Sequence, residues 1–346
     1  MKHSIELRGA QHGRSSRPLR WFQALLLLIG FVVAAPAGAV SCTPQAEMPA
    51  ADRDALIAAA SPLADAVAKQ NLDLLQASLL PAVVADWDSI RAGAQASAPL
   101  LKGGQLHWRN AYFLVATDLK APADTQFFCT TPDSSITVTI NLRSLPPGQY
   151  ALILGDFPGS PQAGQIALIL GFDSKWKLGG LFVREGDLNG HDGVWYWAQA
   201  REQARNNQPW GAWFAYDTAR MLLVPVDFLS SPNLEKLNRE QSQLKANPID
   251  SLPLNVPGTG TDAAGKKWKV TALRVDLTLH AADLGLSYEG TGQSDARAQR
   301  AEAIAVMSGF LKLHPELRES FHGLWAYSET GGKQTYAIEQ AMHDIP

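Results

Sequence analysis

The hydrophobic period of this chain changes after Pro99, and that change limits the fold class. Before Pro99, apolar residues recur at helical spacing, which predicts helices over residues 45–68 and 72–91. After it, the period changes to short apolar runs bounded by turn residues, which are typical of strands. Helices followed by an antiparallel sheet predict an α+β fold. The predicted strands are 106–116, 136–142, 149–154, 165–172 and 176–184.

The first 39 residues carry the three parts of a secretory signal peptide. Four arginines between Arg8 and Arg20 precede an apolar stretch over 21–35, and small residues follow at Ala37-Gly38-Ala39. The apolar stretch is shorter than the roughly 20 residues of a membrane-spanning helix. We therefore expect cleavage near residue 39 and export to the periplasm or the cell exterior.

The part of the chain after residue 39 is acidic. Residues 1–39 hold five Lys or Arg and one Glu of the 30 basic and 33 acidic side chains, so 25 and 32 remain. A net charge near −7 repels phosphate backbones, which argues against a nucleic-acid partner. About 300 residues predict two or three domains in a soluble globular protein.

Cys42 and Cys129 are the only cysteines in the chain. An exported protein meets oxidising conditions, so we expect a disulfide, worth about 4 kcal/mol because it closes a long loop. Residues 39–42 (AVSC) also resemble a bacterial lipobox, which would place a lipid, and the only membrane contact, at Cys42. Two free thiols are the remaining alternative. This pair alone cannot form a metal site.

A family resemblance covers residues 50–185. The run over 63–73 (LADAVAKQNLD) resembles the opening helix and turn of the nuclear-transport-factor-two-like family. The resemblance implies a curved sheet closed around a pocket, so residues 40–188 are expected to form a cone-like α+β domain. Enzymes of the family use Asp and His in that pocket, whereas binding members leave it apolar. His107 lies in a predicted strand where it is either a pocket histidine or a satisfied, half-buried one.

Residues 189–230 are the most aromatic segment. Asp192 is a predicted N-cap, and a turn over 206–209 separates two helices. Small residues among the aromatics resemble a single tetratricopeptide hairpin, which cannot bury both of its faces alone. We therefore expect its tryptophans to form a core shared with the flanking domains; the alternative is an aromatic binding platform. These are Trp195, Trp197, Trp210 and Trp213.

Two segments remain. Residues 231–260 are polar and rich in proline, which predicts a linker with a short surface helix over 235–246. Residues 261–346 predict a small ββαββ domain, in which Ser294 caps a helix over 295–313. Its strands are expected at 268–279, 284–288, 324–328 and 335–339.

No motif in the chain specifies a reaction. His191 and Asp192 could act as acid and base, but loop solvation and helix capping explain both residues equally. The spacing of His314 and His322 with nearby glutamates fits no zinc motif, so no metal or cofactor is predicted. The sequence favours an exported, non-catalytic binding or scaffold protein of the cell envelope, with a protein or small-molecule ligand. The alternative is an isomerase or hydrolase of the cone-like domain that uses His107 or His191.

Overall fold

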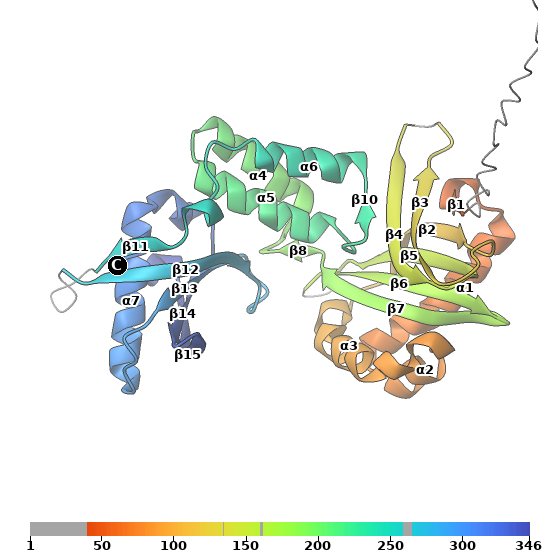
Figure 1. Cartoon of the computed structure of the whole chain (residues 1–346), viewed down its shortest axis with the longest axis horizontal. Coiled ribbons are helices and arrows are strands. Elements are labelled where there is room, and N and C mark those ends of the chain that lie inside the picture. The colour runs from red at the N-terminus through yellow and green to blue at the C-terminus, as the bar shows by residue number, and fades with distance from the viewer. Residues whose placement is uncertain (1–39, 134, 160–161, 259–264) are drawn as a thin grey trace, which may run out of the picture. The chain divides into compact units, whose positions relative to one another are not determined.

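A computed structural model describes residues 40–133, 135–159, 162–258 and 265–346 (Figure 1). The predicted signal peptide lies outside these residues. The described chain is a mixed α+β protein with several largely antiparallel sheets, in agreement with the predicted fold class. None of its described helices combines the length and the apolar character needed to cross a membrane.

The first sheet is antiparallel, with the strand order β1-β2-β5-β6-β7. Its central strands β5 and β6 are apolar and buried along most of their length, and its long strands agree with those predicted from the sequence. The strands are β1 (Ser41–Pro44), β2 (His107–Val115), β5 (Gln149–Phe157), β6 (Gly164–Asp173) and β7 (Lys175–Glu185).

Helices cover one face of this sheet (Figure 1). Val67 of the first helix, Ile153 of β5 and Leu168 of β6 are fully buried in one core cluster, so the space between helices and sheet is filled. The helices are α1 (Ala50–Ala68), α2 (Leu72–Ala77) and α3 (Trp87–Leu101).

The prediction of one helix over 72–91 is wrong. The chain leaves α2 at Ala77, and Leu80 donates its backbone N–H to Leu178 of β7 at 2.8 Å. Pro81 then starts a 3-10 helix (Pro81–Asp86) because a proline cannot continue the preceding helix. A backbone bond to a distant strand therefore divides the predicted helix.

A second sheet, with the order β10-β4-β3, covers the other face. Its strands are β3 (Ala123–Thr130), β4 (Thr137–Leu145) and β10 (Leu229–Ser230). The predicted disulfide is confirmed: Cys42 of β1 and Cys129 of β3 are bonded, with their Cα atoms 5.1 Å apart. It joins the two sheets, and the bonded Cys42 sulfur is not available for a lipid.

The aromatic segment forms a helical hairpin, to which a third helix is added. A two-residue pair, β8 (Asp187–Leu188) with β9 (His191–Asp192), leads into α4 (Gly193–Arg205). It continues with α5 (Pro209–Leu223) and, after β10, α6 (Pro232–Ser242). The hairpin agrees with the predicted pair of helices, and α6 begins close to the helix expected over 235–246.

The C-terminal sheet has the order β11-β12-β13-β14-β15. Helix α7 (Ala296–Leu313) connects β13 to β14, which therefore run parallel, and it packs on the face that carries Leu284, Leu286 and Tyr288. The opposite face carries Asp283, because neighbouring strand residues alternate between faces. The strands are β11 (Leu254–Pro257), β12 (Lys267–Asp276), β13 (Asp283–Glu289), β14 (Gly323–Thr330) and β15 (Lys333–Ala341).

Two details of the C-terminal region differ from the sequence predictions. The segment expected as a linker over 231–260 contributes β11 as a fifth strand, paired with β12. The cap of α7 is Asp295, whose carboxylate accepts from the Ala298 N–H at 2.9 Å, and not Ser294. Further 3-10 helices are Gln45–Glu47, Ile249–Ser251, Pro315–Glu319 and Met342–Asp344.

Candidate functional site

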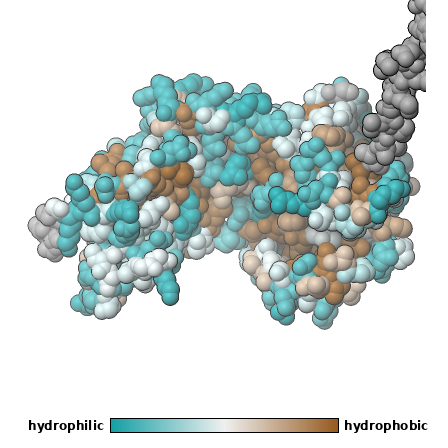
Figure 2. Space-filling view, in the orientation of Figure 1, coloured by the Kyte–Doolittle hydropathy of each residue, from teal (hydrophilic) through white to brown (hydrophobic). Residues whose placement is uncertain are grey.

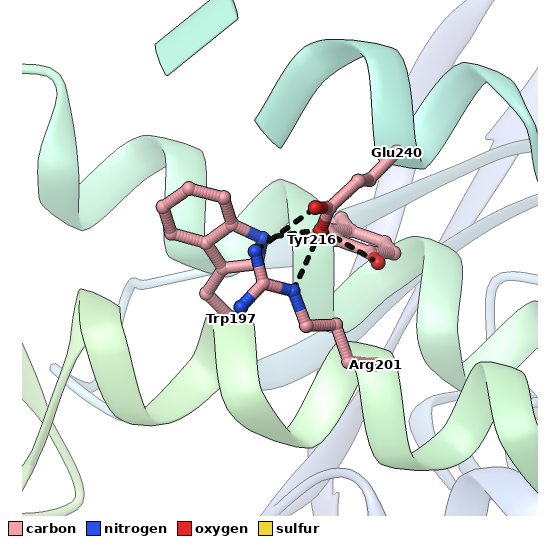
Figure 3. Close-up of polar contacts among 4 residues, drawn as sticks. All are labelled: Trp197, Arg201, Tyr216 and Glu240. Carbon is pink, nitrogen blue, oxygen red and sulfur yellow. Dashed lines mark hydrogen bonds and ion pairs between the residues drawn. The ribbon is translucent and has the colours of Figure 1, made fainter. Parts of the chain in front are cut away.

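Trp197 belongs to a polar cluster that joins three helices (Figure 3). The Glu240 carboxylate of α6 accepts hydrogen bonds from the Trp197 indole nitrogen at 2.7 Å and the Tyr216 hydroxyl at 3.2 Å. The Arg201 guanidinium donates to both carboxylate oxygens at 2.8 and 2.9 Å and lies 4.4 Å from the Trp197 ring centroid. Hydrogen bonds from Arg201 lower the pKa of Glu240 to about 2. Satisfied donors and acceptors of this kind indicate a structural role.

Trp210 and Trp213 lie against the C-terminal core. Trp210 is buried, and its ring stacks on His314 with the centroids 3.6 Å apart. Trp213 is partly buried against the same cluster, next to Phe214. Both rings therefore lie where a core shared between the hairpin and the C-terminal sheet requires them.

Trp195, His191 and Asp192 form a local arrangement at the start of α4. The Asp192 carboxylate accepts a hydrogen bond from the backbone N–H of Trp195 at 2.8 Å and caps the helix. The His191 ring stacks on the Trp195 ring at 3.7 Å, and Trp195 is 38% exposed. In the described ranges no hydrogen bond joins the side chains of His191 and Asp192; the contacts they do form are the helix cap and the ring stack.

His107 is exposed and lies opposite Asp156 in the β2–β5 register. Its neighbour Trp108 points to the helix-covered face, where the indole nitrogen donates to Ser61 at 3.1 Å. Successive side chains alternate, so His107 faces away from the helices. Asp156 instead pairs with Arg109 at 2.9 Å, and burial raises the pKa of Asp156.

A pocket of about 290 Å³ lies on this same side of the first sheet, against the hairpin. In Figure 2, apolar surface gathers beside β10 and β4. The apolar lining residues are Tyr112, Val138, Leu154, Val194, Trp197, Leu223, Pro225, Leu229 and Leu234, and the polar ones are Arg109, Asn110, Ser231 and Asn233. Trp197, a predicted binding residue, lines this pocket together with residues that were not predicted from the sequence.

A larger hollow of about 740 Å³ lies at the ends of α1 and α3. Its charged lining residues include Asp65 and Lys69, which form an exposed pair with each other at 2.9 Å. Such a pair on one helix face is ordinary surface chemistry. This hollow therefore has fewer features of a binding site than the pocket beside β10.

A third group of residues lies on the open face of the C-terminal sheet. Asp283 has no exposed side-chain surface; its carboxylate lies 3.2 Å from His322 Nδ1 and accepts from the Trp325 indole nitrogen at 3.3 Å. Glu339 completes a set whose ligand atoms all lie within 4.8 Å of one another. Burial, followed by the charge of Asp283, raises the pKa of Glu339.

The spacing of His322 alone gave no indication of this cluster. Asp283 begins β13, His322 precedes β14, and Glu339 lies opposite Trp325 on β15. The parallel register of β13 with β14 brings the three together. That register depends on the α7 crossover, so no short motif could have shown it.

Comparisons of the chain with protein-family models, with curated proteins and with solved structures found no match.

Proposed function

We propose that this chain is an exported, non-catalytic binding protein that holds a small, largely apolar ligand in the pocket beside β10. The proposal rests on the size and the lining of this pocket. Its volume of about 290 Å³ is near the lower end of the range of small-molecule sites, roughly 300–1,000 Å³. Its mainly apolar wall with a few polar groups is the composition that such sites share.

The lining supports binding over catalysis. Its described residues include no Asp, Glu, His or Cys, the groups that most often act as acids, bases or nucleophiles. Tyr112 and Arg109 are the titratable ones. Burial raises the pKa of Tyr112, which keeps its hydroxyl protonated at neutral pH.

The charges around the pocket indicate an uncharged ligand. The Arg109 guanidinium pairs with Asp156 at 2.9 Å and also donates to Gln165 at 3.2 Å. Its charge is therefore already balanced. Asn110 and Asn233 offer amide donors and acceptors, so an uncharged molecule with one or two polar groups fits the lining best.

Val194 provides a direct test. It lies at the pocket and is 61% exposed, so Val194→Arg should fill the entrance without disturbing the core. Ligand-observed NMR with a library of small uncharged amphipathic compounds should find hits that bind the parent and are lost in this variant. The matched control is Val84→Arg, because Val84 is 53% exposed but is not part of the lining. Hits that bind all three proteins equally, or no hits at all, would refute the proposal.

Export is tested separately. The basic, apolar and small-residue order of the first 39 residues and the Cys42–Cys129 disulfide both support it. Mass spectrometry of protein recovered from its native cell should show a chain that begins near Val40 and lacks two hydrogens at the cysteines. Intact protein that begins at Met1 and resides in the cytoplasm would contradict export.

A further inference from the structure

We propose that Asp283, His322 and Glu339 bind one Zn²⁺ ion on the open face of the C-terminal sheet. This site is separate from the pocket beside β10 and does not depend on the function proposed for it. The ligand set of two carboxylates and one imidazole suits zinc, which takes nitrogen and oxygen ligands at about 2.0–2.2 Å. Three protein ligands leave a fourth position for water or another molecule.

The charges of Asp283 and Glu339 favour a bound cation. Asp283 is wholly buried, and within the described ranges neither it nor Glu339 forms an ion pair with a lysine or arginine. Burying a carboxylate without a cation is costly, so such groups are normally paired or bound to a metal. Asp276, on the neighbouring strand, provides the contrast. Its carboxylate pairs with Arg274 at 3.1 Å and accepts from the Tyr327 hydroxyl at 2.8 Å.

The three ligand atoms are close enough to approach a single ion. The three ligand atoms lie within 4.8 Å of one another, whereas ligands of one tetrahedral zinc lie roughly 3.3–3.5 Å apart. The widest separation must therefore contract by about 1.4 Å, and rotation of the two less buried side chains can supply it. The His322 side chain is 55% exposed, which leaves an open side for the ion to enter.

Neighbouring groups hold the proposed ligands in place. The His322 backbone donates to Ala282 and accepts from Met342, both at 3.1 Å. Trp325 donates to the second oxygen of Asp283, as an outer-shell partner does when it orients a metal ligand. A side chain at Gly323 would clash with Glu339 and come within 3.1 Å of Asp283, so glycine there leaves room for the two carboxylates.

The test is a zinc titration of the full exported chain, without an affinity tag, after treatment with a chelator. Calorimetry should show one Zn²⁺ per chain, and Zn²⁺ should raise the Tm. His322→Gln removes a ligand that is half exposed, so the variant should fold like the parent. It should bind zinc at least about 100-fold more weakly, since loss of an outer-shell partner alone costs roughly 10–100-fold.

Two further variants test the outer-shell partner of Asp283 and provide a matched control. Trp325→Phe removes the hydrogen bond to Asp283 but keeps an aromatic ring beside Tyr327, and it should weaken zinc binding by roughly 10–100-fold. Glu289→Gln alters an exposed carboxylate at the other end of β13 and should bind zinc like the parent. Absence of one-to-one binding, equal binding by His322→Gln and the parent, or preference for Ca²⁺ over Zn²⁺ would each overturn the assignment.

Discussion

The indole nitrogen of Trp197 donates to the carboxylate of Glu240 at 2.7 Å, across 43 residues of sequence. This bond attaches α6 to α4, although α6 belongs to the segment expected as a linker. Arg201 and Tyr216 add their own bonds to the same carboxylate. One acidic side chain thus fixes the third helix to the hairpin.

Glu240→Gln should destabilise the protein. The change removes the charge that organises the donors from Trp197, Arg201 and Tyr216, and hydrogen bonds to charged groups are worth about 1.5–3 kcal/mol. We expect a loss of about that size in urea unfolding followed by circular dichroism. Glu235→Gln, on the same helix but exposed and only loosely paired with Arg239 at 3.8 Å, is the control and should change little. Equal losses in the two variants would contradict the structural role of Glu240.

The contribution of Glu240 should depend on pH. Its folded pKa of about 2 lies below the ordinary value of 4.5, so the ionised form is the one that stabilises the fold. This contribution is complete above about pH 4.5 and is lost as the pH falls toward 2. The difference in unfolding free energy between the parent and Glu240→Gln should therefore shrink as the pH falls from about 4.5 toward 2. A difference that stays constant over that range would mean that the carboxylate is not the source of the effect.

The Cys42–Cys129 disulfide should contribute strongly to stability. Its cysteines are separated by 87 residues, for which the chain-entropy model gives about 4–5 kcal/mol. The double variant Cys42→Ala with Cys129→Ala should lose an amount of that order in urea unfolding. Added reductant should bring the parent close to the double variant and leave the variant itself unchanged. If reductant had no effect on the parent, the bond would not stabilise the fold as described.

Local patterns predicted the elements whose structure depends on neighbouring residues. The apolar runs of β6 and β7, with the turn at Ser174, could be read from the sequence because both strands and their turn are adjacent. The end of α2 could not, since it depends on the backbone bonds that Ser78 and Leu80 form with Leu178. For the same reason the sequence predicts a linker where β11 lies. The four residues of β11 give no sign of their pairing with β12.

The same distinction between local and long-range contacts applies to the candidate sites. The cap at Asp192 was predicted because its partner is three residues away. The pocket beside β10 could not be predicted in full, because its lining combines side chains of β2, β4, β5 and β10 with side chains of the three helices α4, α5 and α6. The cluster of Asp283, His322 and Glu339 could not be predicted, because it depends on the register of β13, β14 and β15. Sequence spacing reports contacts within an element well, and contacts between elements only where a short turn fixes the register.

Core and surface tryptophans should differ in how much they contribute to the stability of the fold. Trp210 is 9% exposed and stacked on His314 within the C-terminal core, so Trp210→Ala should cost about 3–5 kcal/mol and lower the Tm of the whole protein. Trp213→Ala should cost less, because this ring is only partly buried against that core. Trp195→Ala should cost about 1 kcal/mol, since its main partner is the stacked His191 ring near solvent.

Differential scanning calorimetry of the three variants gives the order directly. A shared core requires that Trp210→Ala melts lowest and Trp195→Ala highest, with circular dichroism showing native secondary structure below each transition. If Trp210→Ala melted like the parent, its ring would not hold the hairpin to the C-terminal sheet. The tryptophans would then serve as a binding platform, and the loss would appear in ligand binding and not in stability.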